Sequence, residues 1–191
     1  MSSVNIKLFD LYTGTCKPEE VDEEGNTILI LACRHNCTDV AIKLIDTFGE
    51  KCKPEQVNDD GDTVLMISIF NNNLNLAIKL IDTFGDKCKP EQVNKYGYTA
   101  LMIAIFKYSV NSLTLAFKLI NTFGDKCKPE QVNDNGDTVL ILTCRPSRRC
   151  TNLAIKLINI FGDKCKPEQV NNNGNTALIL ACCHIDTTNV A

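Results

Sequence analysis

Residues 85–104 read GDKCKPEQVNKYGYTALMIA, and parts of this segment recur along the chain. The string Cys-Lys-Pro-Glu begins at Cys16, Cys52, Cys88, Cys127 and Cys165, in steps of 36, 36, 39 and 38 residues. A glycine followed by X-Thr-X-Leu recurs with the same steps, at Gly25, Gly61, Gly97, Gly136 and Gly174. A period of about 20–50 residues indicates stacked supersecondary units that share one continuous core.

Each repeat is predicted to contain two helices. The first follows the glycine, as in residues 63–70, where Thr63 is placed to cap the helix by accepting a bond from an early backbone N–H. The second is predicted over residues 76–84, because apolar residues fall there at i, i+3, i+4 and i+7: Ala77, Leu80, Ile81 and Phe84. Gly85 is then expected to end the helix, since glycine adopts a positive φ without strain.

The repeats predict one array over 1–191. It comprises an N-terminal half repeat at 1–21, repeat 1 at 22–57, repeat 2 at 58–93, repeat 3 at 94–132, repeat 4 at 133–170 and a truncated repeat 5 at 171–191. The extra length of repeats 3 and 4 lies between their two helices, where a solenoid tolerates longer loops. Because the last repeat lacks a complete second helix, we expect it to fray. We also expect the protein to be either a truncated gene product or one that self-associates end to end.

Composition and charge favour an ordinary globular protein. Of the 191 residues, 44% are apolar and 23% are charged. The net charge of -3 gives no support for nucleic-acid binding. The first residues do not resemble a signal peptide, and no apolar stretch approaches the roughly 20 residues of a membrane helix. We therefore expect no nucleic-acid partner, no membrane partner and a cytoplasmic location.

The chain has eleven cysteines, an odd number. Five of them begin the recurring Cys-Lys-Pro-Glu strings, and we call these five the ladder cysteines. Equivalent positions in stacked helices lie about 8–10 Å apart. A disulfide needs Cα atoms within about 7 Å, and a zinc–sulfur bond measures about 2.3 Å. The ladder is therefore predicted to consist of small buried side chains. Cys33, Cys144 and Cys182 occupy a position held by isoleucine in other repeats, so they are predicted to lie in the core.

Two further clusters, Cys33–Cys37 and Cys182–His184, contain the residue types that bind metals. Residues two apart on a helix do not face each other, which disfavours a metal site at the first cluster. The chain has only two histidines, and it lacks a Gly-X-Ser-X-Gly sequence and a phosphate-binding loop. We expect no catalytic residues, no cofactor and no metal, and hence no enzyme.

The pattern Asn94-X-X-Gly97-X-Thr99-Ala100-Leu101-X-X-Ala104 resembles the ankyrin repeat and recurs five times. The resemblance implies an all-α, ankyrin-like helical repeat solenoid of stacked helix pairs with projecting finger loops. Thr-Pro-Leu-His of that family is here Thr-Ala-Leu-Met in repeat 3, with similar changes elsewhere, so the resemblance leaves the finger geometry open. Tetratricopeptide and Sel1 repeats have a similar period but lack the Gly-X-Thr-X-Leu opening. The Cys-Lys-Pro-Glu-Gln-Val-Asn connector also resembles ankyrin proteins encoded by giant viruses of amoebae, which implies a location in the host cytoplasm.

The ankyrin resemblance implies a non-catalytic protein–protein interaction scaffold or adaptor, acting on host proteins if the chain is viral. In that family the contact surface runs along the finger tips and the end of each first helix. These positions vary between the repeats. Repeat 3 carries Tyr96 and Tyr98 on its finger and Phe106 at the helix end, whereas repeat 2 has an aromatic residue only at the helix end, Phe70. We predict that the partner binds around Tyr96, Tyr98, Phe106, Lys107 and Arg145. The alternative is a passive or degenerate copy with no specific partner, and a more distant one is an enzyme or a metal-binding protein.

Overall fold

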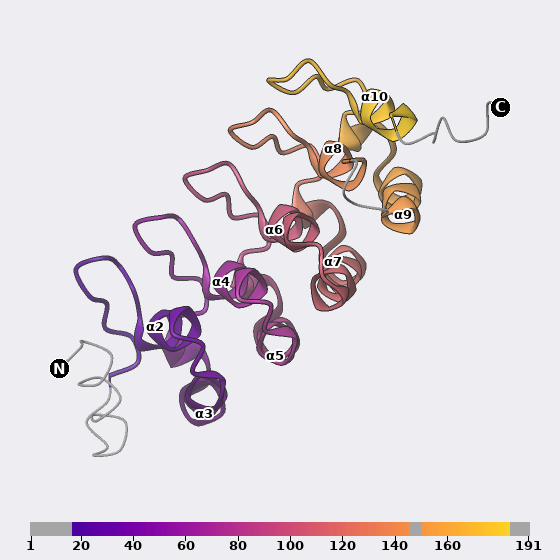
Figure 1. The fold of residues 1–191 in the computed structure, drawn as a ribbon. Helices are drawn as coiled ribbons and strands as arrows, with labels where there is room; N and C mark the ends of the chain where they lie inside the picture. Colours follow the sequence, from indigo (N-terminus) through magenta and orange to yellow (C-terminus); the bar gives the residue numbers. More distant parts are fainter. Residues whose placement is uncertain (1–16, 146–149, 184–191) are drawn as a thin grey trace. The chain divides into compact units, whose positions relative to one another are not determined.

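The computed structural model describes residues 17–145 and 150–183, and the chain forms two compact units, Met1–Gln92 and Val93–Ala191. Each unit consists of helix pairs whose finger loops project on the same side of that unit (Figure 1). Extended backbone pairs only in isolated bridges among the described residues, Val21 with Thr27 and Val57 with Thr63. The predicted all-α repeat architecture is confirmed.

Unit 1 contains two helix pairs, each followed by a short 3-10 helix. Its elements are α2 (Ile28–Arg34), α3 (Thr38–Phe48), η1 (Gly49–Cys52), α4 (Val64–Phe70), α5 (Leu74–Phe84) and η2 (Gly85–Cys88). Helix α2 packs against both α3 and α4, and α3 packs against α5. The first helices therefore form one layer of this unit and the second helices another.

Unit 2 continues the same order of elements. It contains α6 (Ala100–Lys107), α7 (Val110–Phe123), η3 (Gly124–Cys127), α8 (Val139–Thr143), α9 (Thr151–Phe161), η4 (Gly162–Cys165) and α10 (Ala177–Cys182). Helix α8 lies between α6 and α10 and also packs against α9. The repeat boundaries themselves remain predictions. Among the described residues, no helix has the length and apolar character needed to cross a bilayer.

Local chemistry explains where the helices begin and end. Each first helix begins after a threonine whose hydroxyl accepts a hydrogen bond from the backbone N–H three residues later: Thr27, Thr63, Thr99, Thr138 and Thr176. Helix α5 buries Leu76, Ala77, Leu80, Ile81 and Phe84 along one face. Gly85, with a φ of +51°, ends it. The predicted helix starts, apolar stripe and glycine ends are confirmed.

The ladder cysteines join each connector to the helix before it. Cys88 Sγ donates to the carbonyl of Leu80 at 3.3 Å, and the same bond links Cys52 to Leu44, Cys127 to Leu119 and Cys165 to Leu157 at 3.4–3.5 Å. All four of these cysteines are buried. Burial raises the pKa of Cys88 to about 12 and that of Cys165 to about 11. The prediction of small buried side chains is confirmed for these four, whereas Cys16 lies outside the described residues.

The three cysteines predicted to replace core isoleucines differ in burial. Cys33 is buried, Cys144 is half-buried and Cys182 is exposed. The prediction is therefore wrong for Cys182. Its side chain belongs to a face of α10 that no described element covers, as the high exposure of Leu178 on the same helix also shows.

Candidate functional site

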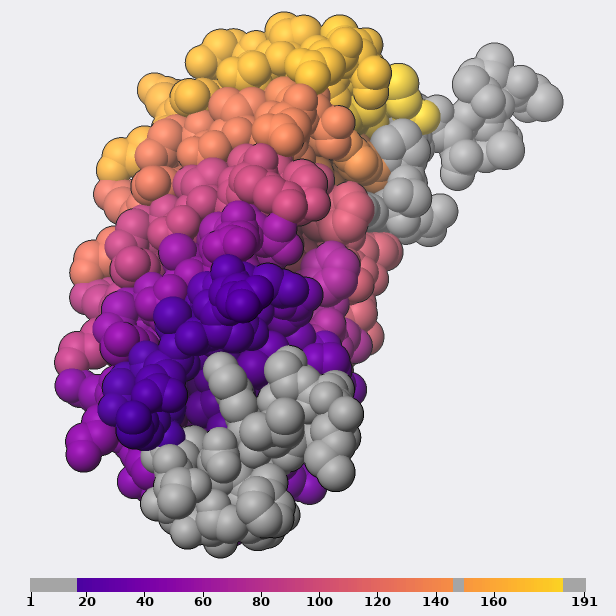
Figure 2. Space-filling model, turned by 90° about the vertical axis from the view of Figure 1, so that its left-hand side faces the viewer, coloured from indigo at the N-terminus to yellow at the C-terminus, as the bar shows by residue number. Residues whose placement is uncertain are grey.

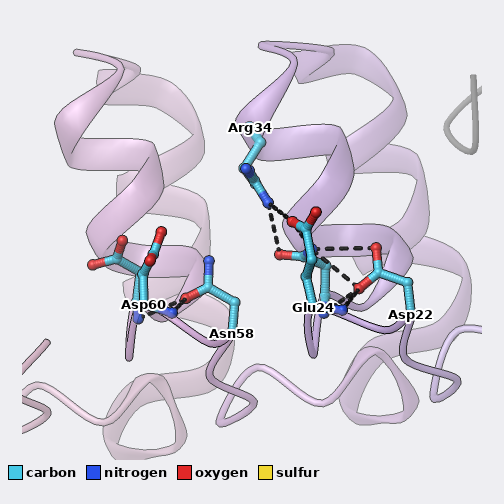
Figure 3. A network of polar contacts seen from close by, with 7 residues as sticks. Asp22, Glu24, Arg34, Asn58 and Asp60 are labelled. Atoms are coloured by element: carbon cyan, nitrogen blue, oxygen red, sulfur yellow. Dashed lines mark hydrogen bonds and ion pairs between the residues drawn. The ribbon is translucent and has the colours of Figure 1, made fainter. Parts of the chain in front are cut away.

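Each finger loop contains the glycine of the Gly-X-Thr-X-Leu sequence, which we call the finger glycine. The Asp or Asn three residues before this glycine fixes the loop through hydrogen bonds to its backbone. In repeat 3, Asn94 Oδ1 accepts hydrogen bonds from the backbone N–H groups of Tyr96 at 3.1 Å and Tyr98 at 3.0 Å. The corresponding residue accepts the same two bonds in the other four fingers: Asp22, Asn58, Asn133 and Asn171. Figure 3 shows this arrangement for Asp22 and Asn58 in unit 1. The fingers are therefore defined structures, although the family's Thr-Pro-Leu-His is missing.

Neighbouring fingers within a unit are joined through their backbones. In unit 2, the N–H of Asp134 donates to the carbonyl of Tyr96 at 3.2 Å. A Cβ atom added to Gly97 would lie 2.7 Å from Asn133 Cα, and the φ of Gly97 is +77°. Only glycine suits both the close approach and the left-handed backbone at this position.

The residue after the finger glycine contacts the end of the first helix of its own repeat. In repeat 3 the rings of Tyr98 and Phe106 meet edge to face, with centroids 5.7 Å apart. In repeat 1, Arg34 Nη1 donates to Asn26 Oδ1 at 3.3 Å and pairs with Glu24 at 2.8 Å (Figure 3). Finger and helix end therefore form one surface in each of these repeats.

The five residues predicted to bind a partner all lie in unit 2. Tyr96 at the finger tip is 51% exposed and Phe106 near the end of α6 is 39% exposed. Tyr98, Lys107 and Arg145 are half-buried. Lys95 Nζ lies 5.1 Å from the centroid of the Tyr96 ring. We call Tyr96, Tyr98 and Phe106 the aromatic patch.

Arg145 has a partner within its own repeat. Its Nη2 donates to Asp137 Oδ2, and the other carboxylate oxygen accepts from Asn171 Nδ2 at 2.8 Å. The Asp137 side chain is fully buried, so it needs both donors to offset its loss of hydration. Arg145 therefore holds the finger of repeat 4 against the end of α8, a role that the sequence did not reveal.

Asn133 is a buried polar residue of the finger in repeat 4 that the sequence analysis did not single out. It is only 5% exposed, yet its Nδ2 has no hydrogen-bond partner within the described residues. The corresponding amide of Asn171 donates to Asp137, the residue after Gly136. For Asn133, the residue in the place of Asp137 is Tyr98, which follows Gly97 and has no carboxylate that could accept this bond. The recurring Asn-X-X-Gly spacing was the available signal, since it singles out the residue that holds each finger.

The residues described here give no sign of catalytic or metal chemistry. Among them, no group of three or more His, Cys, Asp or Glu side chains is placed to hold a metal ion. Burial raises the pKa of Cys33 well above its usual range, which disfavours the thiolate that a metal or a nucleophilic reaction requires. His35 is exposed, and the Cys37 thiol donates to the carbonyl of His35 at 3.6 Å. His184 lies outside the described residues.

Solved structures with a similar fold include two that are named as ankyrin-repeat proteins. The structure titled for the predatory endopeptidase Bd0816 of Bdellovibrio bacteriovorus in complex with immunity protein Bd3460 matches with a TM-score of 0.68 and 22% identity, covering 95% of this chain and 86% of that chain. The ankyrin-repeat protein EF0377 matches with a TM-score of 0.68 and 22% identity, covering 95% and 88%. The ankyrin-repeat domain of Bcl-3, a member of the IkappaB family, matches with a TM-score of 0.65 and 22% identity, covering 94% and 73%.

At 22% sequence identity, these structural matches establish a shared fold only. No curated protein matches the sequence. A family profile described as ankyrin repeats in three copies matches residues 4–89 and 43–121, which together span more than half of the chain. This match agrees with the helix pairs, the glycine-centred fingers and the similar structures. The chain belongs to the ankyrin-repeat family.

Proposed function

We propose that the chain is a non-catalytic adaptor that binds another protein around the aromatic patch of repeat 3. Ankyrin repeats are in general protein–protein interaction modules, and one structural neighbour is titled as a complex of two proteins. The observation that carries the proposal is the exposed Tyr96 ring, at the tip of a finger continuous with Tyr98 and Phe106. Tyrosine is enriched among the few residues that dominate the affinity of interfaces.

The frame around the patch supports this choice of repeat. Asn94 holds the finger at two backbone N–H groups, and Phe106 supports the Tyr98 ring. A surface held in this way loses little conformational entropy when it binds. The corresponding tip residues of unit 1 are acidic, and those of repeats 4 and 5 are Asp and Asn, so repeat 3 alone among the described tips presents a ring.

The exposed rings of the aromatic patch suit a partner that presents an apolar or aromatic side chain. Lys107 at the end of α6 and Arg145 just beyond the end of α8 extend the proposed contact to polar groups. Because the connector resembles those of ankyrin proteins of giant viruses, we propose cytoplasmic host proteins as the first partners to test.

A pull-down from a cytosolic extract tests the proposal. The bait proteins are the wild-type chain, Tyr96→Ala and Asp59→Ala, which removes an exposed tip residue of repeat 2. We expect the wild type and Asp59→Ala to retain the same partner, and Tyr96→Ala to lose it. If no protein is retained specifically, or if all three baits retain the same set equally, the chain is better described as a passive copy without this binding site.

A further inference from the structure

The two junctions between neighbouring fingers of unit 2 share the same backbone contacts. A Cβ atom added to Gly97 would lie 2.7 Å from the Cα of Asn133 in the next finger. One added to Gly136 would lie 2.9 Å from the Cα of Asn171. At each junction a backbone N–H of the later finger also donates to a carbonyl of the earlier one, at 3.0–3.2 Å. In Figure 2 the repeats of unit 2 follow one another as adjacent layers, from pink through orange to yellow. Equivalent side chains at the two junctions can therefore be compared directly.

At the junction between the fingers of repeats 4 and 5, the asparagine amide has an acceptor within the chain. Asn171 Nδ2 donates to Asp137 Oδ1 at 2.8 Å, and Arg145 Nη2 donates to the other oxygen of the same carboxylate. The Asp137 side chain is fully buried, and the guanidinium compensates its charge. The amide, the acceptor and the cation of this junction therefore satisfy one another.

At the junction between the fingers of repeats 3 and 4, the amide is present without the acceptor. Asn133 is 5% exposed, and its Oδ1 accepts from two backbone N–H groups of its own finger. Its Nδ2 lacks a hydrogen-bond partner within the described residues. The acceptor and the cation are replaced here by two rings that meet edge to face, Tyr98 and Phe106. Because the junctions share their backbone contacts, Asn133 Nδ2 is directed toward Tyr98 of the aromatic patch.

We propose that Asn133 Nδ2 donates to a main-chain carbonyl oxygen of the protein partner, next to an apolar side chain that the partner places on the aromatic patch. This contact lies at the proposed binding site and rests on the proposed function. A buried donor without an acceptor costs free energy, which the partner's carbonyl restores. The acceptor is neutral, because Phe106 stands where Arg145 compensates the buried carboxylate in the next repeat. A main-chain carbonyl is an acceptor that brings no unpaired proton of its own.

Tyr98 controls access to this amide. Asn133 Nδ2 is buried, whereas the Tyr98 side chain toward which it is directed is half-buried. The ring turns outward when the partner's carbonyl enters, and it then lies against the partner's apolar side chain. A change of rotamer suffices for this movement, because the backbone N–H of Tyr98 stays bound to Asn94 Oδ1 and the finger keeps its shape.

Selection of phage-displayed random dodecapeptides on the full chain tests this contact. The selected peptides are synthesised, and isothermal titration calorimetry gives their dissociation constants for the wild type and its variants. Asn133→Asp is the informative variant: it keeps the acceptor that holds the finger, as Asp22 does in repeat 1, but has no N–H to donate. Asn58→Asp is the matched control, because Asn58 is also buried and holds its finger in the same way.

We expect the selected peptides to share an apolar or aromatic residue. Asn133→Asp should weaken their binding by about fivefold or more, while Asn58→Asp binds as the wild type. Both variants should keep the circular dichroism of the wild type. A second measurement needs no variant: in nuclear magnetic resonance spectra of the wild type, the side-chain N–H signals of Asn133 should shift on peptide binding, and those of Asn58 should not.

The substitution Tyr96→Ala separates this contact from the proposed function. Peptides that lose affinity for Tyr96→Ala but bind Asn133→Asp as the wild type would overturn the contact and leave the aromatic patch as the binding site. A requirement for Asp or Glu in the peptides would also overturn it, since the acceptor would then be charged. Selection of no peptide, or of peptides indifferent to both variants, would overturn it as well, and the pull-down would then judge the proposed function alone.

Discussion

Arg145, at the end of α8, donates to the fully buried carboxylate of Asp137, which follows the finger glycine of the same repeat. In repeat 3 the same two positions hold Phe106 and Tyr98, which meet as rings. The contact between finger and helix end thus recurs with different chemistry. A repeat can therefore change the chemistry of this contact by exchanging one pair of residues.

Because the Asp137 carboxylate is buried, we expect removal of the Arg145 side chain to lower the free energy of unfolding strongly. Removing one partner of a buried ion pair costs about 3–5 kcal/mol, because the remaining charge is left without compensation. Since Arg145 is partly exposed, we expect Arg145→Ala to lower the free energy of unfolding by about 2–3 kcal/mol in urea denaturation. Arg34→Ala is the control, because its ionic partner Glu24 is exposed. The substitution also removes the 3.3 Å bond to Asn26 Oδ1, so it should cost about 1 kcal/mol. Equal costs would show that the burial of Asp137 is unimportant.

Two finger glycines have the same backbone conformation, but we expect their substitution by alanine to lower the free energy of unfolding by different amounts. Gly97 and Gly174 both have a φ of +77°, but only Gly97 would bring a new Cβ against the next finger, 2.7 Å from Asn133 Cα. Gly174→Ala should cost about 1–2 kcal/mol of unfolding free energy through backbone strain alone. Gly97→Ala should cost about 1–3 kcal/mol more, because the fingers must separate. Similar thermal stabilities for the two variants would argue against the close finger contact.

The ladder thiols predict a loss of stability at alkaline pH. Burial raises the pKa of Cys88 and of Cys127 to about 12 in the folded chain, from an ordinary value of 9.0. Below pH 9 these thiols are neutral whether the chain is folded or unfolded, so they make no pH-dependent contribution. Between pH 9 and 12 the unfolded chain loses these protons first, and stability falls by up to about 1.4 kcal/mol per pH unit for each thiol.

Urea denaturation of the reduced protein at pH 8 and pH 10.5 measures this loss. Other groups titrate in the same range, so the informative quantity is the difference between variants. Cys88→Ala should lose less stability between the two pH values than the wild type does. Cys183→Ala, which changes an exposed cysteine, should behave as the wild type. An identical loss in all three proteins would mean that the Cys88 thiol ionises as easily in the folded chain as in the unfolded one.

The uncovered side of α10 predicts uneven protection from hydrogen exchange. Backbone amides of α10 such as Leu180 should exchange faster than those of α6 such as Ile103. The reason is that Leu178 and Ile179 contribute little buried apolar area, while the side chains of α6 facing its neighbours are buried. Equal protection of α6 and α10 would show that the exposure of Leu178 and Ile179 does not weaken α10.

Much of the frame could be predicted from the sequence because it depends on local chemistry. Thr99 begins a helix and Gly85 ends one through bonds to residues three or four positions away, and the apolar stripe of α5 is visible as a periodicity. The 3-10 helix that begins at Gly85 was not predicted. It ends at Cys88 and is followed by Lys89, whose φ of +48° is a conformation for which lysine gives no sequence signal.

The candidate site was only partly predictable, since its contacts join residues distant in the chain. The exposed Tyr96 could be inferred from its place before the finger glycine. The bond from Asn171 to Asp137 spans 34 residues and depends on how two fingers approach each other. Nothing in the local sequence distinguishes Asn133, without a partner for its amide nitrogen, from Asn171, which has one.

The central claim, that repeat 3 recognises a protein partner, is tested most directly by the dissociation constant of a purified complex. Isothermal titration calorimetry would compare the wild type, the double variant Tyr96→Ala with Tyr98→Ala, and the double variant Glu23→Ala with Asp59→Ala as control. We predict that losing the tyrosines costs more than about 1 kcal/mol of binding free energy, or about a fivefold weaker dissociation constant, and that the control binds as the wild type. Wild-type binding by the tyrosine variant, together with loss of binding by the control, would contradict the account and place the contact on the fingers of unit 1.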